Sequence, residues 1–269
     1  MNALQELWTL FRDPLLTSAL LGMALGLLGV HLVARRLVFV SAALTQVATM
    51  AVALSFLAGV LPGLPGPRWF ALLATLVAFR LLLAWTGGGS REGKLAWVQL
   101  MSGAVAIAIG TRLARERHDL DALLFGTGVL VAPEDLVWGA VVAAIVVLPT
   151  WWLAPSVLAM SADPRGARLR GLPAGRLEWL FVGQVALAVA VGTRVLGAMP
   201  VLALGVLPAL AAGRLVRGPV AALGLAGLLG AVVGVAGYAA AYALDLPVGA
   251  SQTLLAGLLV LMATLVRRP

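Results

Sequence analysis

The side chains that could bind an ion or a small solute within this chain are few and scattered. The sequence has two histidines, His31 and His118, and no cysteine, which excludes thiolate metal sites, cysteine nucleophiles and a cage built of histidines. The polar or sulfur-bearing residues within apolar stretches are His31, Gln46, Met50, Gln99, Met101, Gln184 and Asp245. No two carboxylates or imidazoles among them have the spacing that shares one helical face.

Sequence motifs of enzymes are also absent. The chain has no HExxH or GxSxG motif and no paired carboxylates within an apolar stretch, which disfavours an intramembrane enzyme. It has no GxxxxGK[ST] phosphate loop, so ATP hydrolysis would have to come from another polypeptide. The net charge of +8 is spread over loops, and we expect no nucleic-acid partner.

Composition indicates a polytopic membrane protein. Hydrophobic residues make up 62% of the 269 residues and charged residues 11%, and the mean hydropathy is +1.04. Such a chain has too few charges to cover a water-facing surface. With about 20 apolar residues per crossing, the sequence predicts an all-α transmembrane bundle of about eight or nine spans. The nine apolar segments are Pro14–Leu32, Leu37–Leu61, Trp69–Trp85, Leu95–Leu113, Leu136–Ala154, Leu177–Val195, Met199–Leu215, Val220–Leu244 and Gly249–Val266.

The chain is expected to contain one transmembrane domain, residues 14–269, preceded by a short helix. In residues 1–13, one helical face carries Leu4, Leu7, Trp8 and Phe11, which is typical of an amphipathic helix lying in the membrane interface.

Basic residues predict the orientation of the bundle. If the first span runs inward, twelve of the nineteen Lys and Arg residues fall in inner loops and six on the outer side. The positive-inside rule then places the N-terminus outside and the C-terminus in the cytoplasm. The remaining one, Arg80, lies within a span and is expected to extend to the inner interface.

The longest polar loop on the inner side spans residues 160–176 and contains Asp163, Pro164 and Pro173. It is short enough to form one small helix between turns. Two interpretations remain open, a contact surface for a cytoplasmic partner and a solvated linker.

Five segments carry a family resemblance. Residues 163–173 read DPRGARLRGLP and are similar to the DPExARALGLP segment of permease subunits of the manganese, zinc and iron uptake class of ABC importers. The other segments follow the same order as in that family, from about residue 15 to residue 265. They are Leu27–Arg36, which resembles LLGVFLVLRR, Leu123–Gly126 (LLFG), Val195–Ala212 (VG…LLVIPAATA) and Leu244–Ala250 (LDLPxGA).

This resemblance implies an ABC importer permease in a bacterial cytoplasmic membrane. The implied partners are a cytoplasmic ATP-binding subunit, a second permease copy in a homodimer, an extracytoplasmic substrate-binding protein and membrane lipid. The permease binds no cofactor itself, the partner subunit uses ATP, and the cargo is a divalent metal. The coupling helix that receives the ATPase motion would comprise Asp163, Pro164, Arg165, Gly166, Ala167, Gly171 and Leu172.

One departure from the family pattern concerns the metal ligands. The family carries MSLIGDALSHA after its two arginines, with Asp and His four residues apart on one helical face. Here these positions are Ala42 and Gln46, which supply no ligand and one neutral oxygen. The metal ligands are therefore unknown, and the candidate pathway residues are Gln46, Met50, His31 and Ala42.

Several alternatives stay open. His31 is either a transport residue or an interfacial histidine, and Met50 either lines the pathway or only packs. Asp119 and Asp121, in the long outer segment 114–135, are candidates for docking the binding protein. The cargo could instead be a metal chelate or another solute, and a secondary transporter is the further alternative. A glycine stripe on the eighth span predicts close helix packing or helix sliding: Gly224, Gly227, Gly230, Gly234 and Gly237.

Overall fold

A computed structural model describes residues 3–58, 67–84, 90–113, 131 and 133–266. The described residues form helices joined by turns, as the sequence predicts. These helices are α1 (Ala3–Ala34), α2 (Val38–Ala58), α3 (Pro67–Ala84), α4 (Arg91–Leu113), α6 (Pro133–Trp152), α7 (Ala154–Ala162), α8 (Pro164–Leu169), α9 (Ala174–Val195), α10 (Ala198–Leu215), α11 (Pro219–Leu244) and α12 (Val248–Val266).

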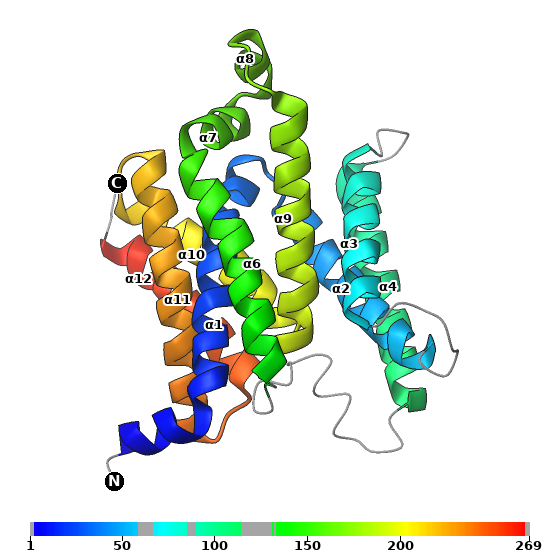
Figure 1. Cartoon of the computed structure of the whole chain (residues 1–269), viewed down its shortest axis with the longest axis vertical. Coiled ribbons are helices and arrows are strands. Elements are labelled where there is room, and N and C mark those ends of the chain that lie inside the picture. Colours follow the sequence, from blue (N-terminus) through cyan, green and yellow to red (C-terminus); the bar gives the residue numbers. More distant parts are fainter. Residues whose placement is uncertain (1–2, 59–66, 85–89, 114–130, 132, 267–269) are drawn as a thin grey trace.

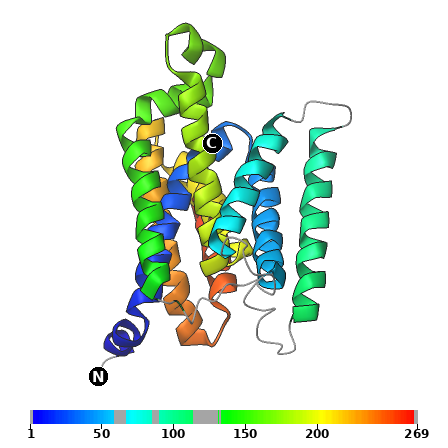
Figure 2. The same ribbon diagram turned by 45° about the vertical axis from the view of Figure 1, so that its right-hand side comes forward.

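Eight of these helices are long and apolar enough to cross a bilayer. They are the spans contained in α1, α2, α4, α6, α9, α10, α11 and α12. The apolar stretch of α3, Trp69–Ala84, is shorter, but α3 lies alongside the others (Figures 1 and 2). The prediction of eight or nine spans is therefore confirmed, with α3 as the short one.

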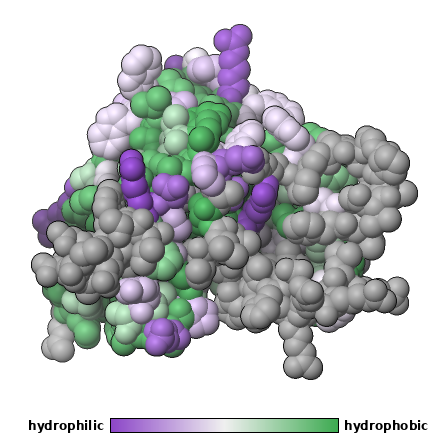
Figure 3. All heavy atoms as spheres, turned by 60° about the horizontal axis from the view of Figure 1, so that its bottom comes forward, coloured by the Kyte–Doolittle hydropathy of each residue, from purple (hydrophilic) through white to green (hydrophobic). Residues whose placement is uncertain are grey.

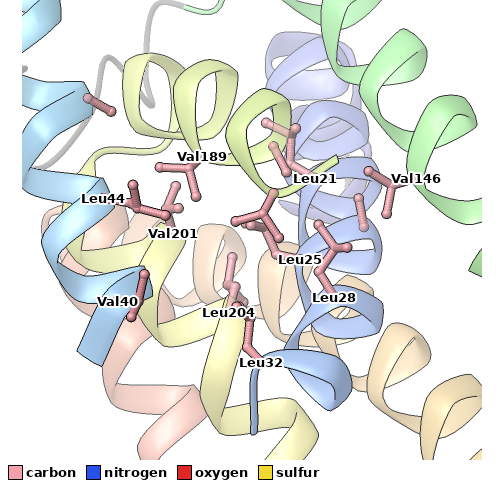
Figure 4. Close-up of a cluster of buried hydrophobic side chains, with 14 of the residues drawn as sticks. Leu21, Leu25, Leu28, Leu32, Val40, Leu44, Val146, Val189, Val201 and Leu204 are labelled. Atoms are coloured by element: carbon pink, nitrogen blue, oxygen red, sulfur yellow. The ribbon is translucent and has the colours of Figure 1, made fainter. Parts of the chain in front are cut away.

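Helix α1 is the central element of the bundle. It packs against α11, α10 and α6 along its length and meets α9 and α7 as well. Leu21, Leu25 and Leu28 point from α1 into the main hydrophobic core, where Val146 of α6 and Leu204 of α10 meet them (Figure 4). Helices α2, α3 and α4 form a group on one side, with α4 outermost and packed chiefly against α2 (Figure 2).

The two ends of the bundle differ. Helix α8 projects from one end, on the far side of α7, and the helical start of α1 lies at the opposite end (Figure 1). Helix α1 is kinked at Phe11 (φ −123°, ψ 23°), three residues before Pro14. The kink separates the first helical turns from the span, and the interfacial position of residues 1–13 stays a prediction.

Small residues allow α1 and α11 to touch backbone to backbone. A Cβ atom built on Gly22 would overlap the carbonyl oxygen of Gly230, and one built on Gly230 would overlap that of Gly22. A Cβ on Gly234 would meet the carbonyl of Ser18 in the same way. The packing interpretation of the glycine stripe is thereby confirmed at Gly230 and Gly234, because a side chain there would force the two helices apart.

Substituting Gly230→Ala is expected to destabilise the protein by about 1–3 kcal/mol, the usual cost of overpacking a closed contact. The matched control is Gly257→Ala in α12, where an added Cβ would meet nothing within 4 Å. Thermal unfolding in detergent measures both variants. Equal unfolding temperatures for the two would contradict the close-contact interpretation.

Candidate functional site

Helix α8 is built by a local cap. The Oδ1 atom of Asp163 accepts hydrogen bonds from the backbone N–H groups of Arg165 (3.1 Å) and Gly166 (3.0 Å), which have no partner within the helix. Pro164 occupies the first helical position, where its missing N–H costs nothing. Gly171 has φ +77° and ends the segment. A six-residue helix thus keeps a defined shape through its flanking residues.

The underside of this segment is fixed to the bundle. Ala167 is fully buried and packs in a small apolar cluster with Met160 of α7 and Leu177 of α9, against which Leu172 also packs. Ala167 and Leu172 therefore attach the segment to α7 and α9.

The outer face of the segment is cationic with one apolar side chain. Arg165, Arg168 and Arg170 are exposed, and Leu169 is 90% exposed. Nothing in the sequence distinguishes Leu169 from the many other leucines of this apolar chain, and only its position on α8 makes it unusual.

The residues at the family's metal positions lie on one face of α2. Ala42, Gln46 and Met50 follow at intervals of four residues; Ala42 is buried, and the other two are half-buried. A Cβ built on Gly103 of α4 would lie 3.2 Å from the Oε1 atom of Gln46. The neutral side-chain oxygen of Gln46 therefore lies against α4.

The described residues hold no group of three or more His, Asp or Glu side chains placed to bind a metal ion. His31 does not join the α2 face: its ring is fully buried, with Nδ1 3.0 Å from the Ser161 hydroxyl of α7. His31 therefore faces the protein interior beside α7, and the choice between a transport residue and an interfacial histidine stays a prediction. Gln46 remains the polar candidate on α2.

Gln184 has a structural explanation that sequence reasoning missed. Pro149 interrupts α6 and lacks the N–H that would bond the carbonyl of Ile145. The Nε2 atom of Gln184, on α9, donates to that carbonyl (2.9 Å), and its Oε1 accepts from the Thr150 hydroxyl (3.4 Å). The amide of Gln184 thus closes a gap in the hydrogen bonds of α6.

The end of the bundle opposite α8 carries a polar contact between α6 and α9. Arg194 lies 3.9 Å from Asp135, whose side chain is largely buried. Trp138, one turn along α6, packs edge to face on Trp69 of α3. Figure 3, which brings this end forward, shows hydrophilic side chains among larger hydrophobic areas. Asp119 and Asp121, the docking candidates of the sequence, lie outside the described residues.

The side chain of Arg80, on α3, packs against an aromatic ring of the neighbouring helix α9. Its guanidinium carbon lies 4.2 Å from the centre of the Trp179 ring of α9. A cation over an aromatic face is attracted by the ring quadrupole. This contact gives the charge a partner where the sequence predicted only extension toward the interface.

These features describe a bundle of membrane-length helices with one short projecting helix, and comparison with known proteins identifies the family. The family model described as the ABC 3 transport family matches residues 8–267. The chain belongs to the ABC 3 transport family. As a member of this family it is an integral membrane permease of an ABC transporter, and the secondary-transporter alternative is not favoured.

Two proteins of similar sequence span most of this ABC 3 permease. It is 28% identical over 261 residues to an uncharacterized membrane protein of Synechocystis, covering 96% of this chain and 90% of that protein. It is 24% identical over 218 residues to the high-affinity zinc uptake system membrane protein ZnuB of Haemophilus influenzae, covering 79% and 80%.

Two solved structures share the fold of this ABC 3 permease. PsaBC from Streptococcus pneumoniae, solved in complex with Fab, superposes with a TM-score of 0.83 at 21% identity, covering 94% of this chain and 90% of that one. A protein described as a metal-chelate type ABC transporter, in an inward-facing conformation, superposes with a TM-score of 0.74 at 16% identity, covering 99% and 90%.

Replacing Gln184→Leu in this permease is expected to cost about 1–3 kcal/mol of unfolding free energy, because a buried carbonyl loses its donor. Pro149→Ala restores the N–H that α6 lacks, so in that background the same replacement is expected to cost clearly less. Unfolding free energies of the four proteins in the cycle measure this coupling. Purely additive losses would show that Gln184 does not compensate for Pro149.

Proposed function

We propose that this chain is the membrane-spanning subunit of an ATP-driven importer that carries a divalent transition metal ion of the zinc, manganese and iron class. The observation that carries the proposal is helix α8, a capped helix held from below by Ala167 and Leu172 and bearing cations on its outer face. The family match over residues 8–267 and the likeness to ZnuB, a zinc uptake protein by its name, support the same function.

The end that bears α8 faces the cytoplasm in this proposal. The excess of arginine in the loops on that side supports it. The N-terminus then lies outside and the C-terminus inside, in a bacterial cytoplasmic membrane. The side chain of Trp152, at the end of α6 nearest α8, is 87% exposed, which suits a headgroup region, where amphipathic rings are favoured.

The proposed partners follow from the surfaces that the single chain leaves open. A cytoplasmic ATP-binding subunit would grip α8 and hydrolyse ATP. A second copy of the permease, together with membrane lipid, would cover apolar side chains exposed on α4 and α12, among them Leu100, Ile107, Leu258 and Leu261. An extracytoplasmic binding protein would deliver the substrate at the end that carries Asp135 and Arg194.

The cargo would pass the α2 face as a weakly held substrate. Ala42 offers no ligand and Gln46 one neutral oxygen, so this face cannot hold a metal ion as a carboxylate and an imidazole would. Met50 adds a soft thioether further along the same face. His31, bonded to Ser161, is assigned to the α8 end of the bundle and not to this pathway.

Transport itself is the direct test. Proteoliposomes that contain the permease, its ATPase and its binding protein are expected to accumulate radioactive zinc or manganese on the ATPase side when ATP is present there. The same vesicles with ADP are the control. Uptake of a metal chelate but of no free ion would show that the cargo is a chelate. Absence of ATP-dependent uptake of either would refute the proposal.

The ATPase contact is expected to depend on Leu169. The side chain is exposed at the tip of α8 among three arginines, a pattern that fits an apolar pocket with an acidic rim. Replacing Leu169→Ala should weaken ATPase binding roughly tenfold, as loss of a central apolar contact commonly does. The control is Leu246→Ala, at the exposed turn after α11. Binding of the ATPase to permease in nanodiscs measures both, and equal affinities would place the contact elsewhere.

A further inference from the structure

A buried polar cluster joins α1, α7 and α9 next to α8. The Nδ1 atom of His31 lies 3.0 Å from the hydroxyl of Ser161, and the Nε atom of Arg35 donates to the same oxygen at 3.2 Å. The guanidinium carbon of Arg35 lies 4.3 Å from the centre of the Phe181 ring, against which the His31 ring also packs edge-on. His31 is fully buried and Ser161 is 4% exposed.

The number of hydrogen bonds that the Ser161 hydroxyl can form determines which nitrogen of His31 carries the hydrogen. Its single hydroxyl hydrogen is donated to the carbonyl of Val157 at 2.8 Å. A hydroxyl oxygen has two lone pairs left, and these accept from Arg35 Nε–H and from His31 Nδ1–H. A neutral His31 therefore carries its hydrogen on Nδ1, and the hydroxyl of Ser161 is fully used.

Among the described residues, Ser161 is the one side chain that forms a hydrogen bond with these two basic side chains. Within the described part of the chain, His31 Nε2 and one terminal nitrogen of Arg35 are buried without a partner. Burial lowers the pKa of Arg35, and the nearby carboxylate of Glu178 opposes that shift. Losing the Ser161 hydroxyl would strand two buried donors, which is costly.

This cluster touches both elements that flank α8. Ser161 lies two residues before Asp163, the residue that caps α8, and Phe181 lies on α9, the helix that follows it. Arg35 therefore contacts the chain on each side of the projecting helix. Arg35 directly follows the last residue of α1, and α1 packs closely on α11 and α10.

We propose that His31, Arg35 and Ser161 are positioning residues that link the movement of α8 to α1. When α8 is displaced by a partner, α7 and α9 shift with it, and the shared hydroxyl carries the displacement to the central helix. The proposal rests on the proposed function, since it requires an ATPase that moves α8. The resembling family pattern has phenylalanine at the position of His31, so the imidazole link is a feature of this sequence.

The test separates coupling from stability in the complete complex in proteoliposomes. Ser161→Ala removes the shared acceptor, whereas Ser156→Ala alters a half-buried serine on the same helix as a matched control. For Ser161→Ala we expect unchanged ATPase binding, because the outer face of α8 is intact, and a roughly three- to tenfold fall in solute transported per ATP hydrolysed. The control should keep the ratio of the unmodified complex.

His31→Phe provides the second variant. It removes one of the two bonds to Ser161 and introduces the residue of the family pattern, and we expect a smaller fall in the same ratio. An unchanged ratio in Ser161→Ala, even with a lower unfolding temperature, would overturn the link. Should Ser161→Ala fail to assemble, the ratio in His31→Phe decides: a fall supports the link, and an unchanged value overturns it. If the unmodified complex shows no ATP-dependent uptake, the proposed function itself fails.

Discussion

The bilayer offers no hydrogen-bond partner, and this constraint explains most polar positions in the bundle. Thr17, Thr45 and Thr75 are buried, and each donates its hydroxyl hydrogen to a carbonyl of its own helix, so none leaves an unpaired donor in the bundle interior. Polar side chains that reach another helix are fewer. Gln184 supplies α6 with the donor that Pro149 removes, and Gln252 of α12 donates to the carbonyl of Gly234 on α11 (3.0 Å). Such cross-helix bonds mark where the helices are held in register.

Close packing and cross-helix bonds divide the bundle into two parts. Around α1, glycine contacts with α11 leave no room for relative movement without separating backbones. The group of α2, α3 and α4 meets the rest of the bundle less extensively, through contacts of α3 and α2 with α9 and of α2 with α10, and α4 packs chiefly on α2. The α2 face with Ala42 and Gln46 therefore belongs to the less constrained part. A pathway that must open and close is better placed there than along the α1–α11 contact.

Much of the fold follows from the sequence, since apolar length and proline or glycine breaks are local signals. The spans, the small helix between Asp163 and Gly171 and the packing role of Gly230 needed no tertiary knowledge. The partners of the polar residues, in contrast, could be found only from the tertiary structure. Nothing in the sequence indicates that His31 meets Ser161, because 130 residues separate them, or that Gln184 serves a proline on another helix. The exposure of Leu169 was equally hidden, because it depends on which face of a six-residue helix packs on the bundle.

The family pattern explained the role expected of residues 163–173 but not the substrate. Where the pattern would place a carboxylate and an imidazole, Ala42 and Gln46 leave one neutral oxygen turned toward Gly103 of α4. Under the proposed function, recognition of the solute would rest less on tight ligation within the membrane. Selection of the solute would then depend more on the proposed binding protein, at the end of the bundle opposite α8.

The exposed side chain of Leu169 on α8 has a consequence for the cell that makes this protein. A permease molecule without its companion carries an apolar side chain, 90% exposed, into the aqueous phase beside several cations. Synthesis of the two polypeptides in matched amounts, as from one transcript, would keep this side chain covered from the moment the bundle is complete.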